Sequence, residues 1–206
     1  MKLSDKVEFI TSVLDELYPE PEIPLEHENN FTFLIAVMLS AQSTDKKVNQ
    51  ITPRLFARAN TPEKMDKLSE REIRTIIREI GLAPTKSKNI KKTCKLLLEK
   101  HNGVIPDNFK DLEGLAGVGH KTASVIMAQA FNIPAFPVDT HIHRLAFRWG
   151  LSNGKNVKTT EEDMKSKFEK KNWNRLHLQM IFYGREYCQA RKSTCECRIC
   201  EGIRDS

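Results

Sequence analysis

Residues 112–127 read Leu112-Glu113-Gly114-Leu115-Ala116-Gly117-Val118-Gly119-His120-Lys121-Thr122-Ala123-Ser124-Val125-Ile126-Met127. Two glycines, one residue apart, stand directly before an apolar segment, a pattern that predicts a tight turn opening a helix. Glycine can adopt positive φ and leaves backbone amides accessible, while the helix N-terminus offers N–H donors and the positive end of a dipole. Such a turn suits phosphate. The same motif also occurs in ordinary helix–helix connections, so its neighbours must decide between the two interpretations.

The rest of the chain repeats its apolar residues at helical spacing, and no window alternates convincingly with period two. The clearest helix covers residues 69–80, where Ser69 and Glu72 can form a capping box and Gly81 is expected to end the helix. Its apolar face consists of Ile73, Ile76, Ile77 and Ile80. Similar faces are formed by Val7, Ile10, Leu14 and Leu17, by Ile90, Cys94, Leu97 and Leu98, and by Ile142, Leu145, Ala146 and Trp149. The sequence therefore predicts an all-α fold, with Cys94 in its core.

Proline-containing breaks near residues 24 and 135 bracket a central helical block. We expect residues 25–135 to form this central domain. Residues 1–24 and 136–206 are then expected to pack together as a second helical lobe.

The composition favours a polyanionic partner without proving one. There are 33 Lys plus Arg against 27 Asp plus Glu, which gives a net charge of +6, and the pI is about 9.0. The N-terminus lacks an apolar run, and the apolar stretch 33–39 is far shorter than the roughly 20 residues that span a bilayer. We therefore expect an intracellular, cytoplasmic protein that is not associated with a membrane.

Two residues are candidates for catalysis. Lys121 stands at the start of a helix, where the dipole disfavours its protonated form and makes a nucleophilic amine easier to reach. A solvated lysine that contacts a phosphate is the alternative. Asp139 is placed to cap another helix, and a carboxylate there can also stabilise a developing cation. The spacing of the two residues does not show whether they face each other.

The cysteines are concentrated near the end of the chain. Four of the five lie within a short segment, at Cys188, Cys195, Cys197 and Cys200. An intracellular protein rarely uses such crowding for disulfides, so metal ligation is the favoured interpretation.

With these residues considered together, the chain resembles bacterial-type endonuclease III, a family of helix-hairpin-helix (HhH-GPD) DNA glycosylases with an associated lyase activity. The resemblance runs almost end to end. It is carried by the segments 39–45, 80–82, 115–123 and 138–144 and by the Cys188-x6-Cys195 spacing.

The resemblance implies a DNA base-excision repair enzyme that removes oxidised pyrimidines from duplex DNA and cleaves the abasic site by β-elimination. Lys121 corresponds to the family's Schiff-base nucleophile and Asp139 to its catalytic carboxylate. The implied fold is a helical barrel domain containing the hairpin, beside a lobe with a metal-cluster loop. The alternatives are an adenine-removing monofunctional glycosylase, which generally lacks the lysine, and a non-catalytic helix-hairpin-helix DNA-binding module.

Damaged double-stranded DNA, bound by a monomer, is the implied partner. Gln42 resembles the residue that fills the space left by a flipped base, and Leu82 resembles the wedge on the opposite side. From residue type alone, Gln42 would be a surface glutamine and Leu82 a buried loop leucine. The expected DNA contacts are Gln42, Leu82, Leu115, Gly117, Gly119, His120, His141, Arg144 and Lys192.

The chain departs from the family pattern in two places. In the hairpin, Ala116 replaces a common proline, and His120 replaces a common arginine or lysine, which weakens phosphate attraction. The cysteines follow Cys-x6-Cys-x-Cys-x2-Cys instead of Cys-x6-Cys-x2-Cys-x5-Cys. A 4Fe-4S cluster remains the expected cofactor, with zinc or an empty site as the alternatives.

Overall fold

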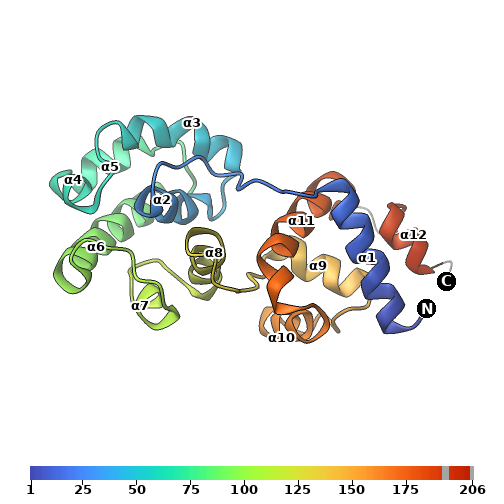
Figure 1. Ribbon diagram of the computed structural model, residues 1–206. Coiled ribbons are helices and arrows are strands. Elements are labelled where there is room, and N and C mark those ends of the chain that lie inside the picture. The colour runs from blue at the N-terminus through green and yellow to red at the C-terminus, as the bar shows by residue number, and fades with distance from the viewer. Residues whose placement is uncertain (192–194, 205–206) are drawn as a thin grey trace. The chain divides into compact units, whose positions relative to one another are not determined.

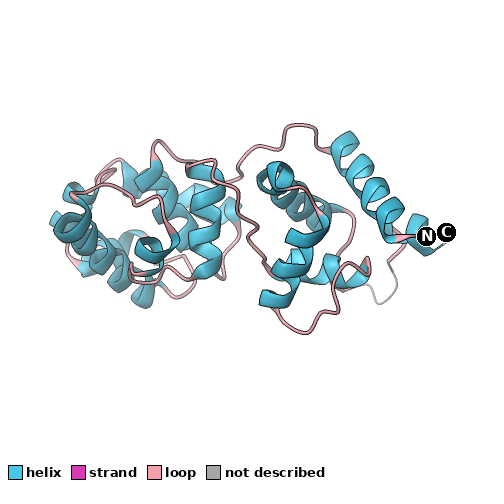
Figure 2. Cartoon of the chain, turned by 60° about the horizontal axis from the view of Figure 1, so that its bottom comes forward, coloured by secondary structure: helices cyan, strands magenta, loops and turns pink. Residues whose placement is uncertain are grey.

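The computed structural model of the chain describes residues 1–191 and 195–204. Within these residues the regular structure is helical throughout and contains no strand (Figure 2). The prediction of an all-α fold is therefore confirmed. The helices separate into two compact units, labelled by their helices in Figure 1. Unit 1 combines Met1–Glu22 with Asn132–Ser206, and unit 2 is Ile23–Phe131.

Unit 2 is built around one buried helix. It contains α2 (Asn30–Ser40), α3 (Asp45–Phe56), α4 (Pro62–Lys67), α5 (Glu70–Ile76), α6 (Ala83–His101), α7 (Phe109–Glu113) and α8 (His120–Ala130). Helix α2 begins at a capping box between Asn29 and Thr32, and every residue from Phe31 to Leu39 is buried. Because α3, α6 and α8 all pack on α2, its apolar run is the centre of this unit.

Helix α5 shows where local pattern and structure differ. The predicted capping box is present, since Ser69 Oγ accepts from the Glu72 amide and Glu72 accepts from the Ser69 amide. The α-helix ends at Ile76, however, and not beside Gly81. The chain continues as a turn in which the Ile80 amide donates to the Ile77 carbonyl at 2.8 Å. This turn keeps both isoleucines buried, so the apolar face continues although the helix does not.

Unit 1 is assembled from two distant parts of the chain. It contains α1 (Leu3–Leu17), α9 (Thr140–Arg148), α10 (Val157–Lys167), the 3₁₀ turn η1 (Lys170–Asn172), α11 (Trp173–Glu186) and α12 (Arg198–Arg204). The predicted face of α9 is confirmed, because Ile142, Leu145, Ala146 and Trp149 are fully buried. Gln179 of α11 ties the two parts together, since its amide donates to Asp15 Oδ1 at 2.8 Å and to the Tyr18 carbonyl at 2.9 Å.

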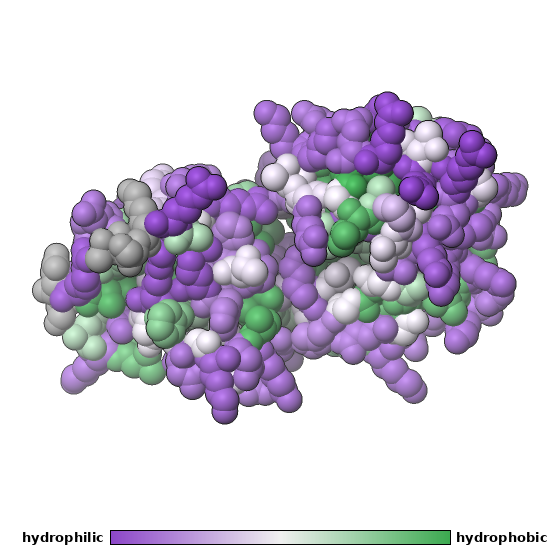
Figure 3. All heavy atoms as spheres, turned by 180° about the vertical axis from the view of Figure 1, so that it is seen from behind, coloured by the Kyte–Doolittle hydropathy of each residue, from purple (hydrophilic) through white to green (hydrophobic). Residues whose placement is uncertain are grey.

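The surface of each unit is mainly hydrophilic on the face shown in Figure 3, where purple side chains surround small apolar areas. Cys94 is fully buried in unit 2, as predicted. None of the described helices is long and apolar enough to cross a membrane.

Candidate active site and metal centre

The predicted phosphate-binding turn joins α7 to α8, and the three elements form a helix-hairpin-helix. Gly117 has a φ of +80°, and a Cβ at this position would lie 2.6 Å from the Asn89 side-chain nitrogen. Gly119 has extended backbone with a φ of −94°, and a Cβ there would meet no described atom within 4 Å. The two glycines therefore have different roles. Gly117 allows the positive φ of the turn, and Gly119 leaves the space beside the turn unoccupied.

Two side chains of α6 support this turn from below. Thr93 Oγ1 donates a 2.8 Å hydrogen bond to the Ala116 carbonyl. The Asn89 side chain fills the space beneath Gly117. Neither residue is predicted from the sequence as a support. Their spacing of four on one helix was the available signal, because residues four apart share a helix face.

The other predicted hairpin residues differ in exposure. The Leu115 side chain is buried and anchors the turn. His120 is exposed, its Nδ1 lies 2.7 Å from Glu113 Oε1, and its ring stacks on Phe109 with 5.4 Å between centroids. Lys121 is exposed in the first turn of α8, directly after the open face of Gly119. The hairpin therefore presents Lys121 to solvent, while the imidazole of His120 is held along α7.

Asp139 begins α9 in unit 1. Its Oδ1 accepts a 2.8 Å hydrogen bond from the Ile142 amide, so the predicted N-cap is present. Asp139 is half-buried and follows the buried Val138. The packed face of α9 fixes the position of this carboxylate within unit 1. Lys121 belongs to unit 2, and each residue is thus positioned by the elements of its own unit.

Gln42 and Leu82 lie at the tips of two neighbouring turns in unit 2. Both have positive φ, 54° and 61°, which is uncommon for residues with side chains. Gln42 is exposed, and Leu82 is 51% exposed, so the interpretation as a buried loop leucine is wrong. The Gly81 amide donates to Ser43 Oγ at 3.2 Å and joins the two turns. The structure thus brings together two residues that lie 40 positions apart in the sequence.

His141 and Arg144 are both half-buried on α9. Arg144 Nη2 lies 3.3 Å from His141 Nδ1 and donates to the carbonyls of Gly184 and Cys188 at 3.0 and 2.9 Å. This guanidinium nitrogen therefore joins α9 to the end of α11 and to the first of the clustered cysteines. A role in DNA contact remains a prediction for both residues. Lys192, the remaining predicted contact, lies outside the described residues.

The four predicted metal ligands converge in unit 1. The Sγ atoms of Cys188, Cys195, Cys197 and Cys200 all lie within 4.8 Å of one another, and all four residues are buried. Arg148, in the last turn of α9, donates from Nη1 to Cys188 Sγ at 3.3 Å and to the Gln189 carbonyl at 2.9 Å. Number, type and burial of these donors fit a thiolate-ligated metal centre.

The electrostatics of the thiols agree with this assignment. Contacts from Cys188 and Cys200 lower the pKa of Cys197, whereas contacts with Cys188 and Cys197 raise the pKa of Cys200. When buried thiols lie this close, one ionises more readily and its neighbours less readily, because several adjacent thiolates would repel one another. Ionising all four requires a compensating cation, which a metal would provide.

Comparison with known proteins places the chain in a family. Residues 35–170 match the HhH-GPD superfamily of base excision DNA repair proteins. The chain is 42% identical to the endonuclease III of Haemophilus influenzae over 203 aligned residues. The aligned region covers 98% of this chain and 96% of that protein. It is 41% identical to the endonuclease III of Escherichia coli with the same coverage. The chain belongs to the endonuclease III family.

A solved structure supports the same assignment at the level of the fold. A trapped endonuclease III–DNA covalent intermediate with an estranged adenine superimposes with a TM-score of 0.90 and 35% identity, covering 99% of this chain and 100% of that one. Because both chains are covered almost completely, the two helical units of this endonuclease III family member both have counterparts there.

The altered cysteine spacing of this chain does not prevent the four thiols from converging. Cys197 directly precedes α12 and Cys200 lies in its first turn, so the two thiols are three residues apart on one helical face. Helix α12 is itself joined to α1, because Nη1 and Nη2 of Arg198 donate to the two carboxylate oxygens of Glu16, each at 2.8 Å. The shortened segment therefore still delivers its last two cysteines to the centre.

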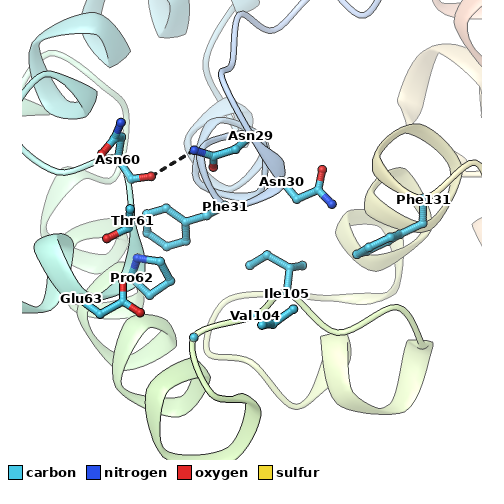
Figure 4. A pocket seen from close by; sticks show the side chains of 11 residues that line it. Asn29, Asn30, Phe31, Asn60, Thr61, Pro62, Glu63, Val104, Ile105 and Phe131 are labelled. Atoms are coloured by element: carbon cyan, nitrogen blue, oxygen red, sulfur yellow. Dashed lines mark hydrogen bonds between the residues drawn. The ribbon is translucent and has the colours of Figure 1, made fainter.

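A hollow of about 530 Å³ in unit 2 is separate from these residues (Figure 4). The side chains of Phe31, Ile105 and Phe131 surround it, together with the amides of Asn29 and Asn30. None of the described candidate site residues lines the hollow.

Proposed function

We propose that this protein is a bifunctional DNA glycosylase and abasic-site lyase that removes oxidised pyrimidines from duplex DNA. The observation that carries the proposal is the exposure of Lys121 in the first turn of α8. It lies two residues after Gly119, beside which the space is unoccupied. The trapped covalent DNA intermediate of the solved relative supports a covalent step on DNA. Borohydride reduction on a duplex with an abasic site tests the proposal, because a Schiff base becomes a permanent adduct. Absence of this adduct contradicts the lyase activity.

The hairpin would hold the DNA backbone. Gly119 leaves room for a phosphate, and as the N-cap it supplies no side chain that would cover the start of α8. The positive end of the α8 dipole attracts the anion. Lys121 is then placed beside the sugar next to the bound phosphate.

Lys121 and Asp139 would both act on this sugar. The neutral amine of Lys121 forms a bond to C1′ as the glycosidic bond breaks, and the base leaves with the bonding electrons and a proton. The Asp139 carboxylate stabilises the positive charge that develops on the sugar. Ring opening gives a Schiff base, loss of a C2′ proton then breaks the C3′–O bond, and water finally releases Lys121. One lysine thereby serves both base removal and strand cleavage.

Gln42 and Leu82 would handle the DNA stack. Extruding a damaged base costs a few kcal/mol, which is lower for a weakened pair. The exposed tip of Leu82 is suited to wedge between bases, and the Gln42 amide can hydrogen-bond in the space left behind. Both roles follow the family resemblance and are supported by the exposure of the two tips.

The two hairpin glycines offer a matched pair of substitutions. Gly117→Ala should destabilise the protein by about 1 kcal/mol or more, because alanine disfavours positive φ and its Cβ contacts Asn89. This corresponds to a fall in thermal midpoint of about 2–4 °C. Gly119→Ala should leave the midpoint unchanged but weaken duplex binding about tenfold, because the methyl group obstructs a charge-assisted phosphate contact. Calorimetry and DNA titration measure both, and equal behaviour of the two variants would contradict the division of tasks.

We propose a 4Fe-4S cluster on the four cysteines, because family resemblance and the complete thiolate set both favour it. When bound, such a centre supplies metal–thiolate bonds that hold α12 to the end of α11. A single zinc ion is a second candidate favoured by one observation. Sulfurs around a single zinc ion at about 2.3 Å are about 3.8 Å apart, and the observed 4.8 Å limit accommodates that spacing.

Metal analysis after anaerobic purification decides between the two candidates. We expect a brown protein with about four iron atoms per chain. A colourless protein with one zinc per chain would exclude the cluster. Cys200→Ser removes one ligand and should lower the amount of bound metal in either case. Cys94 lies in unit 2, so Cys94→Ser should leave the metal content unchanged.

A further inference from the structure

A buried lysine lies directly behind the tips of Gln42 and Leu82. Lys86, in the first turn of α6, is only 6% exposed. Its Nζ donates to the Leu39 carbonyl at 2.8 Å and also to the Ala41 carbonyl. Among the described residues no carboxylate pairs with it. Burial lowers the pKa of Lys86, which reflects the cost of removing an ammonium from water. A charge placed there at such a cost calls for a reason beyond solubility.

Lys86 contacts both turns at once. Its side chain binds the carbonyl of Ala41, the residue before Gln42. Its own amide donates to the Leu82 carbonyl at 2.9 Å. The positions of both tips are therefore set relative to a single residue.

A second link joins the turns on their outer side. Beside the bond from the Gly81 amide to Ser43 Oγ, the two backbones approach so closely that a Cβ on Gly81 would lie 3.0 Å from the Gln42 carbonyl oxygen. Glycine is thus needed at position 81 because of close approach and not because of its φ.

Both tips carry backbone strain that needs such supports. Positive φ at Gln42 and Leu82 raises the free energy of the free protein, and strained residues persist only where the surroundings hold them. Without the two links each turn could relax to a commoner conformation. The tips would then no longer meet the duplex at a fixed separation.

We propose that Lys86 is a positioning residue that holds Gln42 and Leu82 as one rigid pair, so that both enter the DNA stack together. The proposal rests on the proposed function, because it assumes that both tips contact DNA during base extrusion. It assigns Lys86 to the extrusion step and not to the chemistry at Lys121. An intact damaged base must be extruded, whereas an abasic site has no base left to extrude. Loss of Lys86 should therefore impair base release far more than adduct formation at an abasic site.

The experiment compares three variants in the full-length, metal-loaded protein. Lys86→Met keeps the length of the side chain but removes the ammonium, and Lys86→Arg retains a cation. Lys95→Met is the matched control, because Lys95 is an exposed lysine of the same helix whose ammonium lies 3.7 Å from Glu99. Each variant is measured for base release from a thymine glycol duplex, for borohydride trapping on a duplex with a preformed abasic site, and for thermal midpoint. A fluorescent base opposite the lesion reports extrusion.

We expect Lys86→Met to slow base release about 100-fold, which is the usual scale for a misplacement of about 1 Å. Trapping at the abasic site should fall less than about threefold, and the extrusion signal should be lost. Lys86→Arg should restore most of the base release, and Lys95→Met should match the unmodified protein. Equal losses in both reactions, or no loss at all, would show that Lys86 is only a cap for α2. Failure of the unmodified protein in both reactions would instead contradict the proposed function.

Ser43→Ala tests the same pair from the outer side and does not depend on Lys86→Met folding. It removes one acceptor at a half-buried position, so the fold should tolerate it. We expect base release to fall about fivefold, the scale of one lost hydrogen bond, with trapping unchanged. A Ser43→Ala variant with unaltered base release would overturn the coupling of the two tips.

Discussion

Replacing Lys121 with alanine is expected to abolish the borohydride-trapped adduct and to reduce strand cleavage at an abasic site by about 10⁴-fold or more, the scale for losing a nucleophile. Without the amine no Schiff base forms, and β-elimination loses the iminium that acidifies the C2′ proton. Base release should fall as well, because the same amine displaces the base. Denaturing gel electrophoresis of the trapped product measures the adduct directly.

The control for this result is Lys110→Ala, which removes an exposed lysine from α7 on the other side of the turn. It should retain the adduct, because the loss of one nearby positive charge affects only affinity. An adduct that persists undiminished in Lys121→Ala would place the nucleophile elsewhere. Since alanine is well tolerated in a helix, thermal midpoints should be similar for both variants.

Replacing Asp139 with asparagine is expected to slow base release roughly 10²–10³-fold, the range for loss of one electrostatic stabiliser. The structure makes asparagine the informative choice, because Asp139 Oδ1 also caps α9 through the Ile142 amide. Asparagine is as good an N-cap as aspartate, so the cap survives while the negative charge is lost. Single-turnover kinetics on a duplex with an oxidised pyrimidine measure the effect, and titration should show duplex binding within about threefold of the original.

Asp139→Ala separates catalysis from capping. It removes both the charge and the cap, so it should lower the stability by about 1 kcal/mol in addition to slowing base release. If Asp139 only capped α9, asparagine would be nearly neutral and alanine would be harmful. Parallel losses of binding and base release in Asp139→Asn would likewise argue for a purely structural role.

The helices could be predicted from the sequence wherever only one side of the helix packs against the core. The four apolar residues predicted for one side of α9, from Ile142 to Trp149, illustrate this, because all of them are fully buried.

The end of α5 could not be predicted from the sequence. Ile77 and Ile80 continue the apolar pattern through a turn, and burial alone does not distinguish a turn from a helix.

The parts of the candidate site differ in the same way. The hairpin glycines and the Asp139 cap are encoded within a few residues, so the sequence was sufficient to place them. Thr93 and Lys86 act on carbonyls that lie 23 and 45 residues away in the sequence. Such contacts depend on how separate helices pack, so the spacing of residues within one helix does not reveal them. The exposure of Leu82 could not be predicted from its residue type either, because leucine is usually buried, whereas here it is 51% exposed at a φ of 61°.

The discontinuity of unit 1 has a consequence for the order of events during synthesis. Unit 2 is one uninterrupted stretch and can fold as soon as residue 131 has left the ribosome. Helix α1 is made first, but its partners α11 and α12 emerge more than 150 residues later. Closing so long a loop is entropically costly, so the apolar side chains of the α1 segment stay without their packing partners until then. Cys200 is the last of the four thiols to be synthesised, so the hairpin of unit 2 can form before Asp139 and the four cysteines of unit 1 are in place.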